Sequence, residues 1–396
     1  MAARQYRAER RRRLKGILTA LLFVLAAILL IYLMTAESIE DHLFIDEVCG
    51  GAVWQALAKQ AQIEVQVRGI LDRMTLEEKV GQMFLVRFPE ENAEQMIERY
   101  HMGGYILFAR DFRGKTPEQV KEEIAGYQST ALIPMLIGVD EEGGTVTRIS
   151  QNPAFRAEKF SSPQELYQAG GLDMVRQDTR EKCVFLRRLG INLNFAPVAD
   201  VSQSPLDFIY ERSFGKGAAE TAEYVKAVVE IMEEEKIGSV LKHFPGYGNN
   251  SDTHTGVSYD LRSCENFREV DFLPFQAGID AGAEMVLVSH NVVNSMDPFC
   301  PASLSESVHR ILREELGFTG VIITDDLSME GVHEFADDGR IAVLAVKAGN
   351  DFLCCTDFEV QIPAVVEAVR NGEVSEERVE ESAARILRMK ISLELL

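Results

Sequence analysis

Eight short apolar segments recur along the chain from residue 83 onward, and they limit the folds that are open to it. They are rich in Val, Ile, Leu and Phe, and most are separated by at least the length of one helix. The segments are 83–88, 104–109, 134–140, 193–200, 239–244, 285–292, 321–326 and 351–355. Continuously apolar strands joined by helices are typical of a parallel sheet that helices cover on both faces. Eight of them over roughly 330 residues predict a closed (β/α)8 barrel of the TIM type, in the α/β class.

The alternative arrangement is an open, doubly wound sheet. None of the eight segments is followed by a GxGxxG or a Walker-type phosphate-binding motif, which such sheets often carry. An amphipathic stretch at 375–390 is expected to form the last helix, and no second domain is indicated after it. The sequence therefore favours one catalytic barrel over residues 66–396.

The N-terminal region predicts a membrane anchor. Residues 1–16 are basic, with Arg10–Arg13 and Lys15 close to their end, and residues 17–34 contain no charge. Eighteen apolar residues can just cross the hydrocarbon core as a helix, and the preceding basic cluster orients its N-terminus toward the cytoplasm. A cleaved signal peptide is the alternative, although its apolar core is usually shorter. We expect a single-pass protein with a stalk at 35–65 and an extracytoplasmic catalytic domain.

The charge of the chain argues against a nucleic acid partner. The formal net charge is −21 although the first residues are basic, so the remainder is strongly acidic. Nucleic acid phosphates and anionic lipid repel such a surface. Small neutral or cationic substrates remain open, and no cofactor is predicted.

Polar residues collect where the predicted strands end. They are Asp140–Gly144, Asp200, Lys242–His243, Ser289–Asn291 and Thr324–Asp326. Active sites of closed α/β barrels lie at the carboxyl ends of the strands. Polar strand ends also occur in any soluble barrel, but charged groups at so many last positions favour a catalytic site.

Four motifs resemble those of glycoside hydrolase family 3, in its single-domain β-N-acetylglucosaminidase branch. The motifs are KHFPGYGNNSDTH (242–254), VDEEGGTVTR (139–148), ERSFG (211–215) and VIITDDLSMEGV (321–332). The resemblance covers about residues 66–396, with the motifs in the family's order. It implies a barrel that cleaves glycosidic bonds with retention, which requires a carboxylate on one face of the sugar and a proton donor on the other.

Asp325 is the predicted nucleophile. It ends the seventh apolar segment, where a barrel directs a side chain toward its axis. The resemblance assigns this role to the first Asp of TDD, so that Asp326 has a capping or supporting role. Either residue could instead be the N-cap of a helix over LSMEGV, because Asp is a favoured cap.

Asp252 and His254 are the predicted acid–base pair. His254 follows Asp252 by two positions, so a turn can bring the carboxylate to the imidazole, fix its tautomer and stabilise its protonated form. Such a pair can protonate the leaving oxygen near neutral pH and then activate water. The resemblance implies the same role, and the alternative is a surface histidine. The glycines at 246, 248 and 256 predict that this loop moves.

The resemblance implies sugar-binding roles for five further residues. Lys242 and His243 are expected to donate hydrogen bonds to sugar hydroxyls, and Asp140 to accept them. Arg148 and Arg212 match arginines that orient the sugar and its carboxylate partners, although Arg212 could simply hold its loop through a salt bridge. The chain departs from the family pattern at Tyr247, where a second histidine is usual, and in a shorter segment before Asp252.

The sequence as a whole favours an exo-acting, retaining β-N-acetylglucosaminidase that acts on peptidoglycan fragments outside the membrane. The expected partners are N-acetylglucosamine-terminated glycans or muropeptides. A β-glucosidase or β-xylosidase of the same family is the nearest alternative, and phosphorolysis stays open. Metal-dependent hydrolysis is disfavoured because the seven histidines form no HxH pair, so no metal site is predicted. A tethered sugar-binding protein would be expected to lack the nucleophile or the acid–base pair.

Overall fold

The computed structural model describes residues 51–89, 91–250 and 256–396. These residues fall into two compact units that divide between Asp72 and Arg73. In the first unit the described part is helix α3 (Gly51–Leu71), which runs across the predicted boundary at residues 65 and 66. Within the described ranges, no helix is both long and apolar enough to cross a membrane. The predicted anchor at 17–34 lies outside them and stays a prediction.

All eight apolar segments contribute strands to one parallel sheet in the second unit. The strands are β1 (Phe84–Arg87), β2 (Gly104–Leu107), β3 (Leu136–Val139), β6 (Leu193–Asn194), β7 (Gly238–Phe244), β9 (Met285–Val288), β11 (Val321–Thr324) and β12 (Leu353–Cys355). Their order in the sheet is β11-β9-β7-β6-β3-β2-β1-β12. A parallel bridge between Ile323 and Phe352 brings the two outer strands together. The sheet is therefore a nearly closed barrel, which confirms the predicted α/β class and TIM-type architecture.

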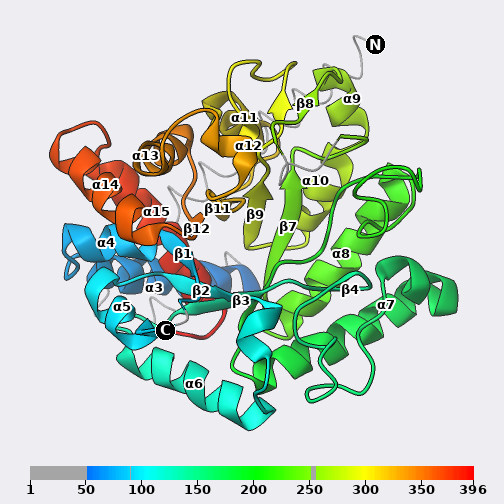
Figure 1. Cartoon of the computed structure of the whole chain (residues 1–396), viewed down its shortest axis with the longest axis horizontal. Helices are drawn as coiled ribbons and strands as arrows, with labels where there is room; N and C mark the ends of the chain where they lie inside the picture. Colours follow the sequence, from blue (N-terminus) through cyan, green and yellow to red (C-terminus); the bar gives the residue numbers. More distant parts are fainter. Residues whose placement is uncertain (1–50, 90, 251–255) are drawn as a thin grey trace. The chain divides into compact units, whose positions relative to one another are not determined.

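Helices surround this ring of strands, as Figure 1 shows. They are α4 (Leu76–Gln82), α5 (Ala93–Tyr100), α6 (Pro117–Thr130), α7 (Pro163–Arg188), α8 (Ala218–Glu234), α9 (Cys264–Glu269), α10 (Phe272–Asp280), α11 (Glu306–Arg310), α12 (Glu330–His333), α13 (Asp338–Ala348), α14 (Phe358–Arg370) and α15 (Glu376–Ser392). Capping boxes at Thr75, Thr116 and Ser162 start three of them, with each hydroxyl accepting from the N–H three residues later. These caps satisfy backbone donors that a helix end leaves unpaired.

Two small sheets lie in the connections that follow the barrel strands. A hairpin of β4 (Glu141–Gly143) and β5 (Val146–Thr147) follows β3 directly. Strand β8 (Tyr259–Asp260), which follows β7 along the chain, pairs in parallel with β10 (Val292–Val293), which follows β9. Both sheets thus order loops at the end of the barrel where the predicted site residues lie.

Two local predictions differ from the structure. Strand β6 keeps only two residues of the predicted segment 193–200, and beyond Pro197, which has no N–H to donate, pairing with β7 resumes only as an isolated bridge at Val198. The helix expected directly after Asp326 begins only at Glu330, with Met329 as its N-cap residue. The prediction that Asp326 caps this helix is therefore wrong, and its side chain holds a preceding turn instead.

Candidate active site

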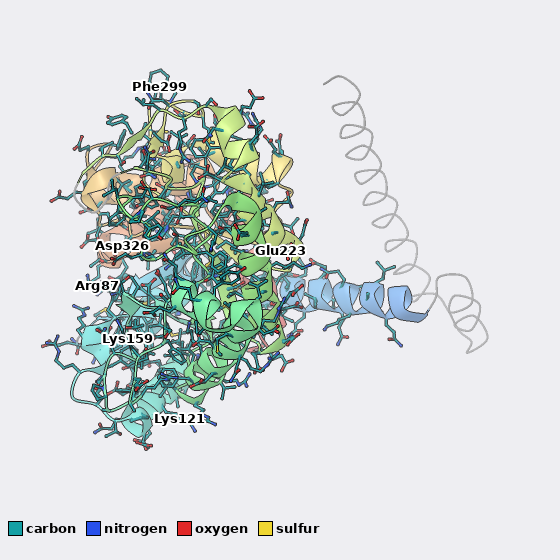
Figure 2. The ribbon with its side chains drawn as sticks, turned by 90° about the vertical axis from the view of Figure 1, so that its right-hand side faces the viewer. Arg87, Lys121, Lys159, Glu223, Phe299 and Asp326 are labelled. Atoms are coloured by element: carbon teal, nitrogen blue, oxygen red, sulfur yellow. The ribbon has the colours of Figure 1, made fainter. Side chains whose placement is uncertain are left out.

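A cavity of about 390 Å³ lies at the carboxyl ends of the strands. Among the residues that line it are six of the predicted site residues: Asp140, Arg148, Arg212, Lys242, His243 and Asp325. Arg87 and Asp326 also line it and lie on the same side of the molecule in Figure 2. The predicted acid–base pair, Asp252 and His254, lies outside the described residues. The structure thus brings together residues from five of the eight strand ends, as expected for a barrel enzyme.

The two neighbouring carboxylates after β11 have different surroundings. The Asp325 N–H donates to the Val288 carbonyl, 3.1 Å away, and the Asp325 Oδ1 accepts from the Asp326 N–H at 2.9 Å. The Asp326 Oδ1 accepts from the N–H and hydroxyl of Ser328 at 2.9 and 2.8 Å. Asp326 therefore fixes the turn, which agrees with the supporting role expected for it.

A chain of alternating charges forms one wall of the cavity. The Lys242 Nζ lies 2.7 Å from the Asp140 Oδ1 and 2.7 Å from the Glu142 Oε1. The Arg212 guanidinium donates twice to Glu142, at 2.8 and 3.1 Å, and the Arg148 Nη2 lies 3.6 Å from Asp140. Each charge in this wall thus has an opposite neighbour, and these pairings offset the cost of removing the charges from water.

Glu142 is the centre of this network, although the sequence analysis gave it no role. Burial by itself would raise the pKa of Glu142, but the charges of Arg212 and Lys242 outweigh burial and hold the pKa well below its usual range. Its side chain is only 3% exposed. Glu142 is therefore a fixed anion that holds two cations against the cavity, rather than a group that exchanges protons near neutral pH.

His243 is held between a carboxylate and a guanidinium. Its Nδ1 lies 2.7 Å from the Asp200 Oδ2, and its Nε2 lies 3.2 Å from the Arg212 Nη2. Arg can only donate, so Nε2 accepts and the ring proton is on Nδ1. In this arrangement His243 has no N–H left for a sugar hydroxyl, and the geometry favours a role in positioning Arg212.

Tyr247 packs behind this histidine. Its side chain is buried, and its ring lies edge-on to that of His243 at a centroid distance of 5.1 Å. The Tyr247 N–H donates to the Asp200 Oδ1 at 2.7 Å. The departure from the family motif at this position therefore adds a buried aromatic contact directly beside the cavity.

Two arginines that line the cavity also flank one aromatic ring. The Arg87 and Arg148 guanidinium carbons lie 4.7 and 5.6 Å from the centre of the Phe108 ring. Among the described residues, no carboxylate lies within 4.0 Å of the Arg87 guanidinium nitrogens. Arg87 thus presents donors that substrate hydroxyls or anions can use.

Cys354 also lines the cavity but is unsuited to nucleophilic chemistry. Burial, followed by the charges of Asp326 and Asp325, raises the pKa of its thiol well above the usual value. The thiolate is the reactive form of cysteine. In the described part of the chain there is likewise no group of three or more His, Cys, Asp or Glu side chains placed to bind a metal ion.

Sequence reasoning missed the roles of Glu142, Asp200 and Arg87. Glu142 lies inside a motif that was singled out for Asp140, and Asp200 was noted only as a polar strand end. Arg87 is the last residue of β1. Polar residues at the ends of other strands were predicted to lie in the site, and Arg87 has the same position relative to its strand. A systematic reading of the last residue of each apolar segment and of the three residues after it would have assigned roles to Asp200 and Glu142.

The comparisons with known proteins agree with this site. Residues 75–389 match the family model described as glycosyl hydrolase family 3 N-terminal domain. A beta-hexosaminidase of Xanthomonas campestris pv. campestris is 34% identical over 231 residues, which are 58% of this chain and 69% of that protein. A solved β-N-acetylglucosaminidase of the same family from Paenibacillus sp. is 31% identical with a TM-score of 0.76, and the match covers 81% of this chain and 63% of that one. The structure of Mycobacterium tuberculosis LpqI is 29% identical with a TM-score of 0.74, over 82% of this chain and 96% of that one.

The barrel and its charged cavity define an enzyme with its site at the strand ends. Since the family model covers well over half of the chain, the protein belongs to glycosyl hydrolase family 3 and is a glycoside hydrolase.

Proposed function

We propose that the protein is an exo-acting, retaining β-N-acetylglucosaminidase. The observation that carries the proposal is the cavity at the strand ends, which Asp325 lines together with Lys242 and Arg212, the two cations that Glu142 holds. Its volume of about 390 Å³ is near the lower end of the range for small-molecule sites, which suits a single terminal sugar. The relatives described as beta-hexosaminidases and as a β-N-acetylglucosaminidase support the choice of sugar.

In the first step the Asp325 carboxylate attacks the anomeric carbon, and the bond to the leaving oxygen breaks. His254, held by Asp252, protonates that oxygen, and a glycosyl ester on Asp325 results. In the second step His254 takes a proton from water, the water oxygen attacks the same carbon, and the Asp325 carboxylate is released. The two displacements return the original β configuration.

The charged wall binds and orients the sugar. Lys242 has three donors, and with two directed at carboxylates the third can reach a hydroxyl. Asp140 keeps part of its carboxylate exposed to accept from hydroxyls. Arg148 donates to the sugar, while Arg212 and His243 hold the wall in place behind it.

The proposed substrates are N-acetylglucosamine-terminated peptidoglycan fragments. The basic segment and apolar run of residues 1–34 support a catalytic domain on the outer side of the cytoplasmic membrane, where the wall is the nearest source of such ends. The acidic chain disfavours nucleic acid as a partner.

The test uses the full chain in detergent with 4-nitrophenyl β-N-acetylglucosaminide and the matching β-glucoside and β-xyloside. We expect hydrolysis of the acetamido sugar only, with β-N-acetylglucosamine as the first product seen by proton NMR. Preference for the glucoside or xyloside would move the protein to another activity in the same family. A first product in the α configuration would overturn retention, and no turnover of any substrate would favour a binding-only protein.

A further inference from the structure

A buried cluster of charges lies outside the walls of the cavity, in the connection after β7. The Arg262 guanidinium lies between two aspartates, with Nη2 2.7 Å from the Asp260 Oδ2 and Nη1 2.8 Å from the Asp271 Oδ2. The two carboxylates are completely or almost completely buried, and Arg262 is 21% exposed. We refer to Arg262, Asp260 and Asp271 as the anchor cluster.

The anchor cluster holds both ends of the segment that contains the predicted acid–base pair. On the incoming side, the Arg262 Nη2 donates to the Gly246 carbonyl at 2.9 Å, and the Asn250 amide donates to the Asp260 Oδ2. On the outgoing side, Asp260 is itself part of β8, which pairs with β10. Two stretches of chain on either side of residues 251–255 are therefore tied to the same carboxylate.

The backbone fits so closely around the cluster that only glycine is accommodated at two positions. A Cβ on Gly246, which has φ +129°, would lie 2.2 Å from the Asp271 Oδ1. A Cβ on Gly248, which has φ +52°, would lie 2.5 Å from the Arg262 Cζ. Close packing and backbone conformation explain these two glycines, and the predicted movement of the loop stays a prediction.

A short path of hydrogen bonds joins the anchor cluster to the cavity. Gly246, whose carbonyl accepts from Arg262, precedes Tyr247, whose N–H donates to the Asp200 Oδ1. The Asp200 Oδ2 in turn accepts from the His243 ring. The start of the segment is thus fixed relative to the wall of the cavity at two successive residues.

We propose that Arg262, with Asp260 and Asp271, is a positioning group for proton transfer: it fixes both ends of the segment that carries His254. This inference rests on the proposed function, in which His254 is the acid and base. The outer tie joins residues sixteen positions apart and the inner tie residues ten positions apart, and fixing these ends limits the positions that His254 can reach. Arg262 does not touch the substrate; it acts through the chain.

The state of Asp271 is consistent with this role. Burial raises the pKa of Asp271 to about 7, although the charge of Arg262 lowers it. Without Arg262 the two buried carboxylates would face each other without a cation. The cluster therefore depends on the guanidinium, and a lysine could not make both bidentate contacts.

The experiment compares two leaving groups in the full chain. A 2,4-dinitrophenyl group departs without protonation, whereas a 4-methylumbelliferyl group, whose phenol is a weaker acid, depends more strongly on the acid. The variants are Arg262→Lys and Asn250→Ala, with Arg268→Lys as the matched control. Arg268 is a half-exposed arginine on α9 that pairs with Glu315, and within the described ranges none of its hydrogen bonds or ion pairs goes to residues 246–262. Because kcat/KM reports the first step, it is the quantity to measure.

We expect Arg262→Lys and Asn250→Ala to lower kcat/KM for the 4-methylumbelliferyl β-N-acetylglucosaminide by about tenfold or more, part of the effect of a general acid. The 2,4-dinitrophenyl substrate should change by no more than about twofold, and Arg268→Lys should change neither. An equal loss on both substrates, or no loss on either, would overturn the proposal. If Arg262→Lys does not fold, as judged by circular dichroism, Asn250→Ala decides.

His254→Ala is measured in parallel to separate the two proposals. If it shows the selective loss and the anchor variants do not, only the positioning role is wrong. If His254→Ala shows no selective loss, the acid assignment in the proposed function is wrong, and the positioning role falls with it.

Discussion

Asp325 and Asp326 are neighbours in sequence, yet their surroundings predict opposite sensitivities to substitution. Asp326 uses its carboxylate to hold Ser328, and an asparagine keeps an oxygen for that contact. An asparagine at position 325 cannot form the glycosyl ester. We expect Asp325→Asn to lower kcat by at least about a thousandfold, and Asp326→Asn by no more than about tenfold. Steady-state kinetics of the two purified variants check this, and equal losses would contradict the assignment.

Glu142 gives a second prediction at this scale, for stability. Glu142→Gln removes the anion that Arg212 and Lys242 share and leaves buried cations without compensation, so we expect a loss of about 3 kcal/mol. The pKa of Glu142 is lower in the folded protein than in the unfolded chain, where it is about 4.3. The carboxylate therefore stabilises the fold fully above that pH, and this stabilisation is lost as the pH falls toward the pKa of the folded protein. Urea unfolding at pH 7 measures it.

The matched control is Glu234→Gln. Glu234 pairs with Arg180 at 2.6 Å, but both side chains are about half exposed, so its loss should cost less than about 1 kcal/mol. Similar losses in the two variants would show that the network around Glu142 contributes no more than a surface pair.

At the scale of elements, the β4–β5 hairpin holds Arg148 through Glu141. The Glu141 carboxylate is buried and accepts from the N–H groups of Arg148 and Ile149, at 3.0 and 2.8 Å, and from the Ser150 hydroxyl. In Glu141→Gln an NH2 group replaces one of the acceptor oxygens, so the turn that carries Arg148 should shift. We expect KM to rise about tenfold with a smaller change in kcat. Ser150→Ala, which removes only one donor, should have a weaker effect, and an unchanged KM in Glu141→Gln would exclude this role.

The strands and helices also show which parts of the fold could be predicted from the local sequence pattern. All eight strands could be predicted because each is a continuous apolar run, and buried parallel strands have that composition. The short β6 and the late start of α12 were not predicted. Pro197 lies within an otherwise apolar segment, and the turn at Ser328 takes up residues that were expected to be helical. The pairing of Glu142 with Arg212 and Lys242, and the anchor cluster, join residues from separate connections. These residues become partners only when the barrel closes. In the sequence alone, a charged residue in a connection that is buried and paired cannot be told from one that is exposed to solvent.

At the scale of the whole molecule, the last helix is fastened to the first helix of the barrel by a buried lysine. Lys390 of α15 donates to the Gln82 Oε1 of α4 at 2.6 Å, and burial lowers the pKa of Lys390 to about 7. Between about pH 7 and 10.4 the unfolded chain holds a proton that the folded chain has lost, so rising pH favours folding. We expect the stability of the wild type, relative to Lys390→Met, to rise by about 1 kcal/mol per pH unit from pH 7 to 9.

Urea unfolding of both proteins at pH 7, 8 and 9 measures that difference. The comparison cancels groups that titrate equally in the two proteins. Parallel pH profiles would show that Lys390 keeps an ordinary pKa in the folded protein.

The central claim is that Asp325 forms a covalent glycosyl ester in the full protein, and trapping of this ester tests it most directly. The protein is incubated with a 5-fluoro glycosyl fluoride of the N-acetylglucosamine configuration, digested with trypsin and sequenced by tandem mass spectrometry. We expect one added sugar on the peptide spanning residues 314–340, located on Asp325 and absent in Asp325→Asn. A label on Asp326 or on another peptide would contradict it, as would full hydrolysis of the reagent without any labelled peptide.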